Sequence, residues 1–199
     1  LYFTKDILLA KTTIENKKKD ANIILLDIQA EQEEALLQTF KSKGLDVINN
    51  VPIITMRMER IRDRSVNEIR QDSTANMKKW VLNREFRVTY RDALSETEEL
   101  IEGEWTGKAT LGKPIPISIS DNMAEDAGLK LGDKVVFNVQ GVLMETFVGS
   151  IRKVDWTSLQ INFMILFPTG VLEKAPQFNV MTTYVPDKES SAALQRDLV

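Results

Sequence analysis

Residues 115–156, IPISISDNMAEDAGLKLGDKVVFNVQGVLMETFVGSIRKVDW, carry in order the signals for a strand, a short helix, a helix stop, a turn and two long strands. Asp121 is placed to cap a helix over residues 122–127, because a short carboxylate can accept the free amide hydrogens at a helix start. Gly128 is the expected stop, since glycine readily takes the left-handed conformation that ends many helices. This half of the stretch predicts a strand followed by a short helix.

The second half of the same stretch predicts a β-hairpin. Gly132 and Asp133 form a turn signal in front of a strand over residues 134–140. Gly141 is expected to turn the chain into a second strand over residues 142–154. The whole stretch describes a β scaffold and contains no obvious catalytic constellation.

The composition restricts the chemistry that the chain can perform. Its 199 residues include no cysteine and no histidine, which excludes thiolate nucleophiles, Cys or His zinc sites and histidine-dependent mechanisms. A formal net charge of -3 and the lack of a basic, aromatic-interleaved stripe argue against nucleic acid as a partner. We expect no enzyme activity, no catalytic residue, no cofactor and no metal site. The sequence also has no run of about 20 apolar residues that could span a bilayer.

The N-terminal part of the chain predicts an α+β unit. Residues 2–14 have a helical apolar pattern, which favours an amphipathic helix on the domain or a stalk continuing from a membrane span. The start at Leu1 rather than at methionine favours an excised or processed polypeptide. A strand over residues 22–28, a helix over 31–43 and a strand over 47–61 then form a βαβ-like unit. A proline at position 52 places that part of the last strand at a sheet edge or bulge.

The middle of the chain is predicted to be mostly β structure. Residues 86–91 alternate between apolar or aromatic side chains and polar ones, the period of a half-exposed strand. Further strands are expected over residues 99–105, 115–119, 134–140, 142–154 and 161–167.

A second α+β piece is expected at the C-terminal end, with a strand over residues 178–185 and a helix over 189–198. The predicted fold class is therefore α+β. A discontinuous α+β lobe with an N-terminal stalk helix, residues 1–83 and 176–199, would carry an inserted β-rich lobe, residues 84–175.

The order of motifs is similar to that of a known family. Residues 117–141, ISISDNMAEDAGLKLGDKVVFNVQG, resemble the extracytoplasmic domains of FtsX-like and MacB-like ABC transporter permeases, in which strand, helix, GLKxGD and strand follow one another. Over about residues 22–190 the chain looks like the lysophospholipase-related or lipoprotein-related subgroup. The further matching residues are Arg84, Phe86, 89–92, 102–105, 151–156, 162–163, 167–170 and 175–176.

This resemblance implies a MacB-like periplasmic core between two membrane helices that lie outside the sequence. It implies a cell-membrane protein whose domain lies on the extracytoplasmic side, with a separate cytoplasmic ABC ATPase subunit as its partner. The domain would bind and transmit rather than catalyse, coupling ATP hydrolysis to a hydrophobic or lipid-linked substrate or to an extracytoplasmic protein.

Two segments nearly match catalytic motifs, but the neighbouring sequence excludes the chemistry of both. Residues 107–113, GKATLGK, approach the phosphate-binding loop, but Pro114 replaces the required hydroxyl and a strand rather than a helix follows. Ser150 and Lys153 match S-x-x-K, yet in a strand residues three apart point to opposite faces.

Acidic residues give a third set of candidates. A carboxylate-dependent hydrolase using Glu102, Glu104 or Asp121 is the least favoured hypothesis, because a solvated strand face explains the two glutamates. The trio at residues 90–92 is more typical of a structural ion pair and hydrogen bond than of a site.

The stretch at residues 162–172, NFMILFPTGVL, is the candidate contact region. It is either a buried strand ending in a Pro-Gly turn or an exposed apolar surface that contacts a partner or a lipid. The candidate contact residues are Phe163, Met164, Ile165, Phe167, Val171 and Leu172. The alternative to the permease hypothesis is a free-standing small-β-barrel module that binds a ligand in the barrel mouth.

Overall fold

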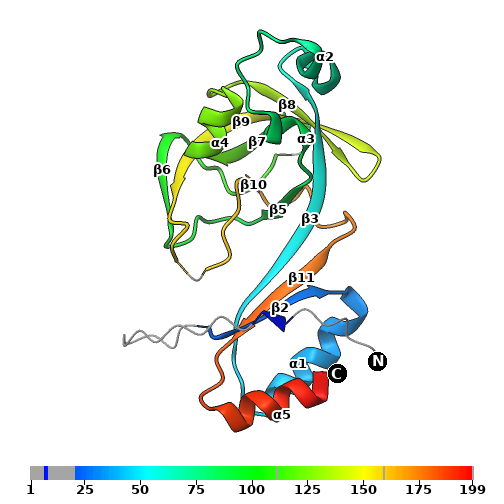
Figure 1. Cartoon of the computed structure of the whole chain (residues 1–199), viewed down its shortest axis with the longest axis vertical. Coiled ribbons are helices and arrows are strands. Elements are labelled where there is room, and N and C mark those ends of the chain that lie inside the picture. Colours follow the sequence, from blue (N-terminus) through cyan, green and yellow to red (C-terminus); the bar gives the residue numbers. More distant parts are fainter. Residues whose placement is uncertain (1–6, 9–20, 111, 159, 199) are drawn as a thin grey trace. The chain divides into compact units, whose positions relative to one another are not determined.

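The computed structural model describes residues 7–8, 21–110, 112–158 and 160–198 (Figure 1). The chain divides into two compact units: unit 1, residues 1–53 and 177–199, and unit 2, residues 54–176. The first boundary therefore falls at residue 54 rather than at the predicted residue 84. The reason is that residues 62–83 contribute buried side chains to the core of unit 2.

Unit 1 is an antiparallel sheet with two helices. Its strands are β1 (Ile7–Leu8), β2 (Ile23–Ile28), β11 (Phe178–Thr183) and the first part of β3 (Val47–Ile61), in the order β1-β2-β11-β3. Since β11 is antiparallel to both β2 and β3, those two strands run parallel with β11 between them. With α1 (Ala30–Ser42) as the connection, this is a split βαβ unit.

The core of unit 1 explains the pattern of its helices. Leu36 and Phe40 of α1 and Leu194 of α5 (Lys188–Leu198) are buried with Met181 of β11. Pro52 pairs with Asn179 in the part of β3 that forms the edge of this sheet, as predicted for a residue without an amide hydrogen. The predicted N-terminal helix lies mostly outside the described residues, and its two described positions form β1.

Unit 2 is built on a closed ring of six strands. Residues 54–61 of β3 pair with β5 (Phe86–Tyr90), which pairs with β10 (Ile165–Phe167), then β7 (Ile115–Ser120), β9 (Val142–Val154) and β8 (Lys134–Val139). Because β8 also pairs with β3, the ring closes into a barrel. The α+β class is confirmed, but the β-rich part is this six-stranded barrel rather than a specific MacB-like arrangement.

The remaining elements of unit 2 lie at the rim and the edge of the barrel. They are β4 (Arg64–Ser65), α2 (Val66–Gln71), α3 (Lys79–Asn83), β6 (Glu98–Gly103) and α4 (Asp121–Ala127). β6 pairs with the second half of β9 and ends the strand order. Phe137 and Phe167 meet inside the core with ring centroids 5.6 Å apart, so apolar side chains fill it.

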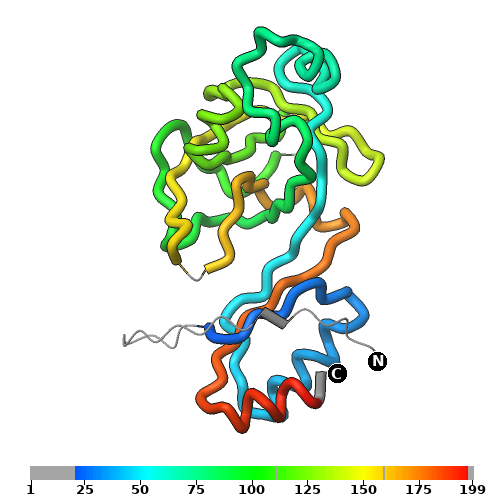
Figure 2. The backbone as a smooth tube through the Cα atoms, viewed as in Figure 1, coloured from blue at the N-terminus to red at the C-terminus, as the bar shows by residue number. Residues whose placement is uncertain are grey.

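Residues 115–156 fold largely as their sequence predicts. Gly128 ends α4 in the left-handed conformation with φ 60°, and β8 and β9 form the expected hairpin. The hairpin turn, yellow-green in Figure 2, has φ 50° at Gln140 and 100° at Gly141. One detail is wrong: the N-cap of α4 is Ser120, and Asp121 is the first helical residue. The Asp121 side chain instead accepts the amide hydrogen of Asn122 at 2.8 Å.

Candidate functional site

The predicted contact residues belong to the interior of unit 2. The side chains of Phe163, Ile165, Phe167 and Leu172 are at most 4% exposed, and Met164 and Val171 are half-buried against the same core. β10 pairs with β5 and β7, so it is a central strand of the barrel, and all three of its residues are buried. In this conformation the four buried side chains cannot contact an external partner.

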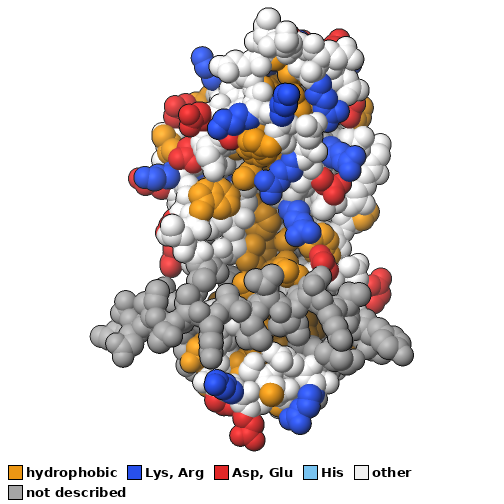
Figure 3. All heavy atoms as spheres, in the orientation of Figure 1, with side chains coloured by type: hydrophobic (Ala, Val, Ile, Leu, Met, Phe, Trp, Pro, Cys, Tyr) orange, Lys and Arg blue, Asp and Glu red, His pale blue; other side chains and the backbone are white. Residues whose placement is uncertain are grey.

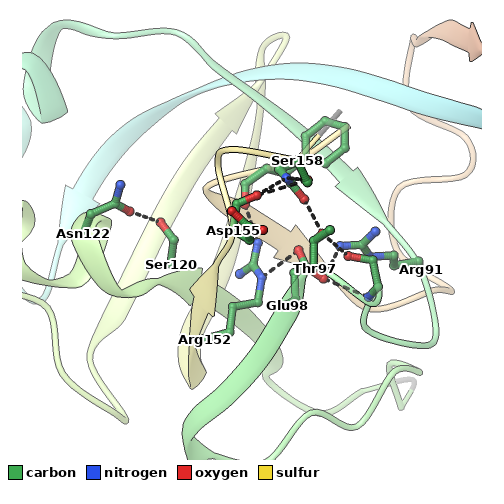
Figure 4. Close-up of polar contacts among 11 residues, drawn as sticks. Arg91, Thr97, Glu98, Ser120, Asn122, Arg152, Asp155 and Ser158 are labelled. Carbon is green, nitrogen blue, oxygen red and sulfur yellow. Dashed lines mark hydrogen bonds and ion pairs between the residues drawn. The ribbon is translucent and has the colours of Figure 1, made fainter. Parts of the chain in front are cut away.

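The most unusual group in unit 2 is an ionic cluster formed by Arg91, Glu98 and Arg152 (Figure 4). Nε of Arg152 donates to Oε1 of Glu98 at 3.0 Å, and both side chains are completely buried. Arg91 donates from Nη2 to the other carboxylate oxygen, which also accepts the amide hydrogen of Ser95. The carboxylate of Glu98 therefore joins the guanidinium of Arg152 on β9 to that of Arg91, the residue that follows β5.

The ionic cluster also fixes the loop between β9 and β10. Nη2 of Arg152 donates to the carbonyl oxygen of Phe163 in that loop. The side-chain amide of Asn162 accepts from Thr97 Oγ1 at 2.8 Å and donates to the carbonyl oxygen of Asp155 at 2.9 Å. The Arg152 bond thus connects this loop to β9, and the Asn162 bonds connect it to the residue before β6 and close it on its own first residue.

Burial and charge oppose one another in this cluster. Desolvation lowers the pKa of Arg152, and the neighbouring Glu98 carboxylate opposes that shift. Desolvation also lowers the pKa of Arg91, although the Arg91 side chain is 24% exposed. One carboxylate faces two guanidinium groups, so the cluster carries an excess positive charge. Among the described residues, Nη1 of Arg152 has no hydrogen-bond partner.

The sequence predicts a structural ion pair at residues 90–92, and Arg91 does form one, but its partner Glu98 and the second guanidinium, that of Arg152, were not predicted. The available signal was Arg152 itself, which shares a strand face with Ser150 and Val154 in the middle of an otherwise buried run. Its partner Glu98 precedes the exposed residues of β6 and looks like a surface residue in the sequence.

The near-match motifs adopt the conformations that exclude their chemistry. The described part of residues 107–113 leads into strand β7, so no helix follows it. Ser150 is buried and Lys153 is exposed on the same strand β9, as expected for opposite faces. In the described part of the chain, no three acidic side chains gather in a way that could hold a metal ion.

The acidic candidates lie at exposed or partly exposed positions of unit 2. Glu102 is exposed on β6, Glu104 is exposed just beyond it, and Asp121 begins α4. The distinctive feature of unit 2 is a closed barrel in which buried charged hydrogen bonds from Arg152 connect β9 to Glu98 of the edge strand β6 and to the loop that precedes β10.

Comparison with known proteins gives one informative match. The chain is 29% identical over 156 residues to an ABC transporter permease of Escherichia coli strain K12, YbbP, which is described as uncharacterized. The match covers 78% of this chain and 18% of that protein, so the chain spans less than a fifth of its relative. No family model matches.

A solved domain of a candidate permease from Porphyromonas gingivalis is also similar, at 11% identity and a TM-score of 0.35. That likeness covers 81% of this chain and 69% of the solved chain and is too distant to support an argument. Within the described residues, no helix has the length and apolar character needed to cross a bilayer. Over most of its length, this chain is similar to one segment of an ABC transporter permease.

Proposed function

We propose that the chain is the extracytoplasmic domain of an ABC transporter permease of the FtsX-like and MacB-like type, and that it is not an enzyme. The similarity to a permease over 156 residues is the observation that carries this proposal. The full-length protein would be anchored in the cell membrane by helices on either side of the domain. A cytoplasmic ATPase subunit would supply the energy, and the domain would pass movement to a hydrophobic or lipid-linked substrate or to a protein outside the membrane.

The division of the chain supports this role. A domain that lies between two membrane helices must return both of its ends to one bilayer, and both flanks of this chain belong to unit 1. Unit 2 is inserted between them, entered through β3 and left before β11. Its barrel has a packed core and a buried ion pair between two strands. Such a barrel suits a domain that transmits movement as a rigid body.

The alternative, a small barrel that binds a ligand in its mouth, is less favoured. The barrel interior is occupied by tightly buried side chains, including Ile54, Phe137 and Phe167, all at 0 or near 0% exposure. A small-molecule site needs open volume lined by a few polar groups. Because its interior is packed with side chains, the barrel has no open volume for a ligand, and we expect it to act as a scaffold.

Cysteine labelling of the full-length protein tests the membrane side. Because this chain has no native cysteine, a Val142→Cys substitution, at a position 64% exposed, introduces a unique reactive thiol into the domain. In a cysteine-free background of the rest of the protein, we expect a membrane-impermeant maleimide to label it in intact spheroplasts. The same substitution after permeabilisation is the control for accessibility. Labelling that requires permeabilisation would place the domain in the cytoplasm and overturn the proposal.

A second measurement tests the partner. Affinity purification of the full-length protein from membranes is expected to recover an ABC ATPase subunit, and ATP hydrolysis by that complex should survive in the Val142→Cys variant. A reading frame without apolar spans on both sides of the chain would contradict the proposal at once.

A further inference from the structure

Strand β6 forms an open edge of the sheet in unit 2. It pairs with β9 on one side and ends the strand order, so no described strand pairs with its other side. All residues from 99 to 104 are exposed. Among the described residues, the backbone groups of residues 99–103 form no hydrogen bond outside the ladder with β9. The outer edge of β6 therefore presents backbone donors and acceptors to solvent.

The exposed charges along this edge are acidic. Residues 98–104, EELIEGE, contain four glutamates and no lysine or arginine. Glu98 belongs to the buried ionic cluster, whereas Glu99, Glu102 and Glu104 are exposed and form no ion pair in the described part of the chain. Figure 3 shows acidic side chains, in red, along the left side of unit 2, where Figure 1 places β6.

The basic groups beside β6 do not cancel this charge. Arg152 is completely buried and, like Arg91, is bonded to the carboxylate of Glu98. On the paired part of β9, Lys153 is exposed and lies opposite Glu99 in the register, but the two form no ion pair in the described structure. One exposed lysine thus stands against three exposed glutamates, and the edge keeps an excess negative charge.

Two apolar side chains lie between the glutamates. Leu100 is 40% exposed and Ile101 is 51% exposed. Ile101 is the extra residue of a bulge, since Leu100 and Glu102 pair with successive residues of β9. A strand added to this edge would remove part of this apolar area from water, which favours binding.

The acidity of the edge decides between two kinds of occupant. Charges and bulges protect the edges of natural sheets against pairing with copies of themselves. Two copies of β6 would bring glutamate against glutamate, and like charges on adjacent strands are destabilising. The same charges attract a strand that carries lysine or arginine. The edge therefore disfavours a second copy of the chain and favours a basic segment.

From this arrangement we infer that β6 binds an extended basic segment of a partner protein, which adds to the sheet as a further strand. Backbone hydrogen bonds along the outer edge hold the segment, as in other complexes formed by strand addition. Its basic side chains meet Glu99 and Glu102, and its apolar side chains cover Leu100 and Ile101. The inference rests on this edge alone and does not depend on the membrane side or the transport role proposed above.

Titration of the 199-residue chain with short synthetic peptides tests the inference, with amide chemical shifts in a ¹H–¹⁵N NMR spectrum as the measurement. The probe alternates lysine and valine. One control peptide has glutamate in place of lysine, and a second is methylated at every backbone nitrogen, which keeps the side chains but removes all amide donors. The probe is expected to shift the amides of residues 99–103 in a saturable way, and added salt should weaken its binding. Both controls should bind at least about tenfold more weakly.

Paired variants locate the binding surface. Glu99→Gln with Glu102→Gln should weaken binding of the probe by about tenfold. Glu34→Gln with Glu145→Gln removes the same charge at two exposed positions away from β6, on α1 and on the part of β9 that pairs with β8, and should bind as the native chain does. The spectra of the variants without peptide show whether the fold is kept.

Several outcomes would overturn the inference. They are the absence of saturable binding by the probe, equal binding of either control peptide, and unchanged binding by Glu99→Gln with Glu102→Gln. Shifts of residues 99–103 when the chain alone is concentrated would assign the edge to a second copy and would overturn it as well.

Discussion

Nε of Arg152 lies 3.0 Å from Oε1 of Glu98, and neither side chain is exposed to solvent. Removing the carboxylate charge leaves a buried guanidinium without its counterion, which is far more costly than the pair itself. We expect Glu98→Gln to lower the free energy of unfolding by about 3 to 5 kcal/mol. Urea denaturation followed by tryptophan fluorescence measures the change.

A double variant separates an unpaired charge from lost packing. Replacing both partners by apolar residues, Glu98→Leu with Arg152→Met, removes the buried charges together and should recover much of the loss, because apolar replacements of buried ion pairs are often neutral. The Arg91 side chain, which is 24% exposed, can turn its guanidinium toward solvent in this variant. A Glu98→Gln protein that is as stable as the native one would show that the cluster contributes no net stability.

Two glycines allow a test of steric against conformational strain. A Cβ atom at Gly103, φ 76°, would lie 2.2 Å from the backbone oxygen of Gly149, whereas one at Gly141, φ 100°, would meet nothing within 4 Å. Gly141→Ala should therefore cost only the strain of a positive φ angle, about 1 to 3 kcal/mol. Gly103→Ala must also displace β6 from β9, so its loss of unfolding free energy should be clearly larger. Equal losses in the same urea assay would contradict this close approach.

The hairpin and the glycine stop could be predicted from the sequence because their determinants are local. Gly128 ends a helix through its own left-handed conformation, and Gln140 with Gly141 forms the hairpin turn through positive φ angles at these two adjacent residues. The same is true of α1, whose buried Leu36 and Phe40 follow a helical spacing. Local signals therefore located most elements of both units.

The barrel closure and the ionic cluster depend on pairs that are far apart in the sequence. β8 closes the ring where Phe137 pairs with Met58 of β3. Glu98 and Arg152 are separated in the sequence by several elements, among them β7 and α4. Neither pairing has a periodic signature. The apolar run at residues 163–167 was ambiguous for a related reason: a strand buried on both faces and an exposed apolar surface have the same composition, and only the neighbours of β10 decide between them.

Acid should weaken the bridge between Arg62 and Asp133. The hydrogen bond from Arg62 lowers the pKa of Asp133 below its ordinary 3.8. A carboxyl whose pKa is lower in the folded state stabilises the fold above the unfolded pKa, and this contribution is lost as pH falls through the folded pKa. Unfolding free energy should fall between about pH 4 and pH 2, with Asp72, whose pKa is lowered to about 2 mainly by Thr74, contributing over the same window.

The variant Asp133→Asn isolates the bridge from the other carboxylates. It should make the fall in stability between about pH 4 and pH 2 shallower, and Arg62→Gln should have the same effect because it removes the main cause of the lowered pKa of Asp133. The two substitutions together should flatten the profile no more than either alone. A native slope in Asp133→Asn would assign the acid sensitivity to other groups.

Ser118 of β7 and Ser150 of β9 are register partners, both are completely buried, and among the described residues neither hydroxyl has a hydrogen-bond partner. A buried hydroxyl without a partner costs about 1 to 3 kcal/mol of desolvation. Ser118→Ala and Ser150→Ala should therefore leave the unfolding free energy unchanged or raise it by about 1 kcal/mol. Thr146→Val is the contrast on the same strand, because the Thr146 hydroxyl donates to the carbonyl oxygen of Val135 at 2.8 Å. That substitution should lower stability by about 1 kcal/mol. If the serine variants lose as much stability as Thr146→Val, the two serine hydroxyls must have hydrogen-bond partners in solution. In that case the hydroxyls stabilise the pairing of β7 with β9 rather than weaken it.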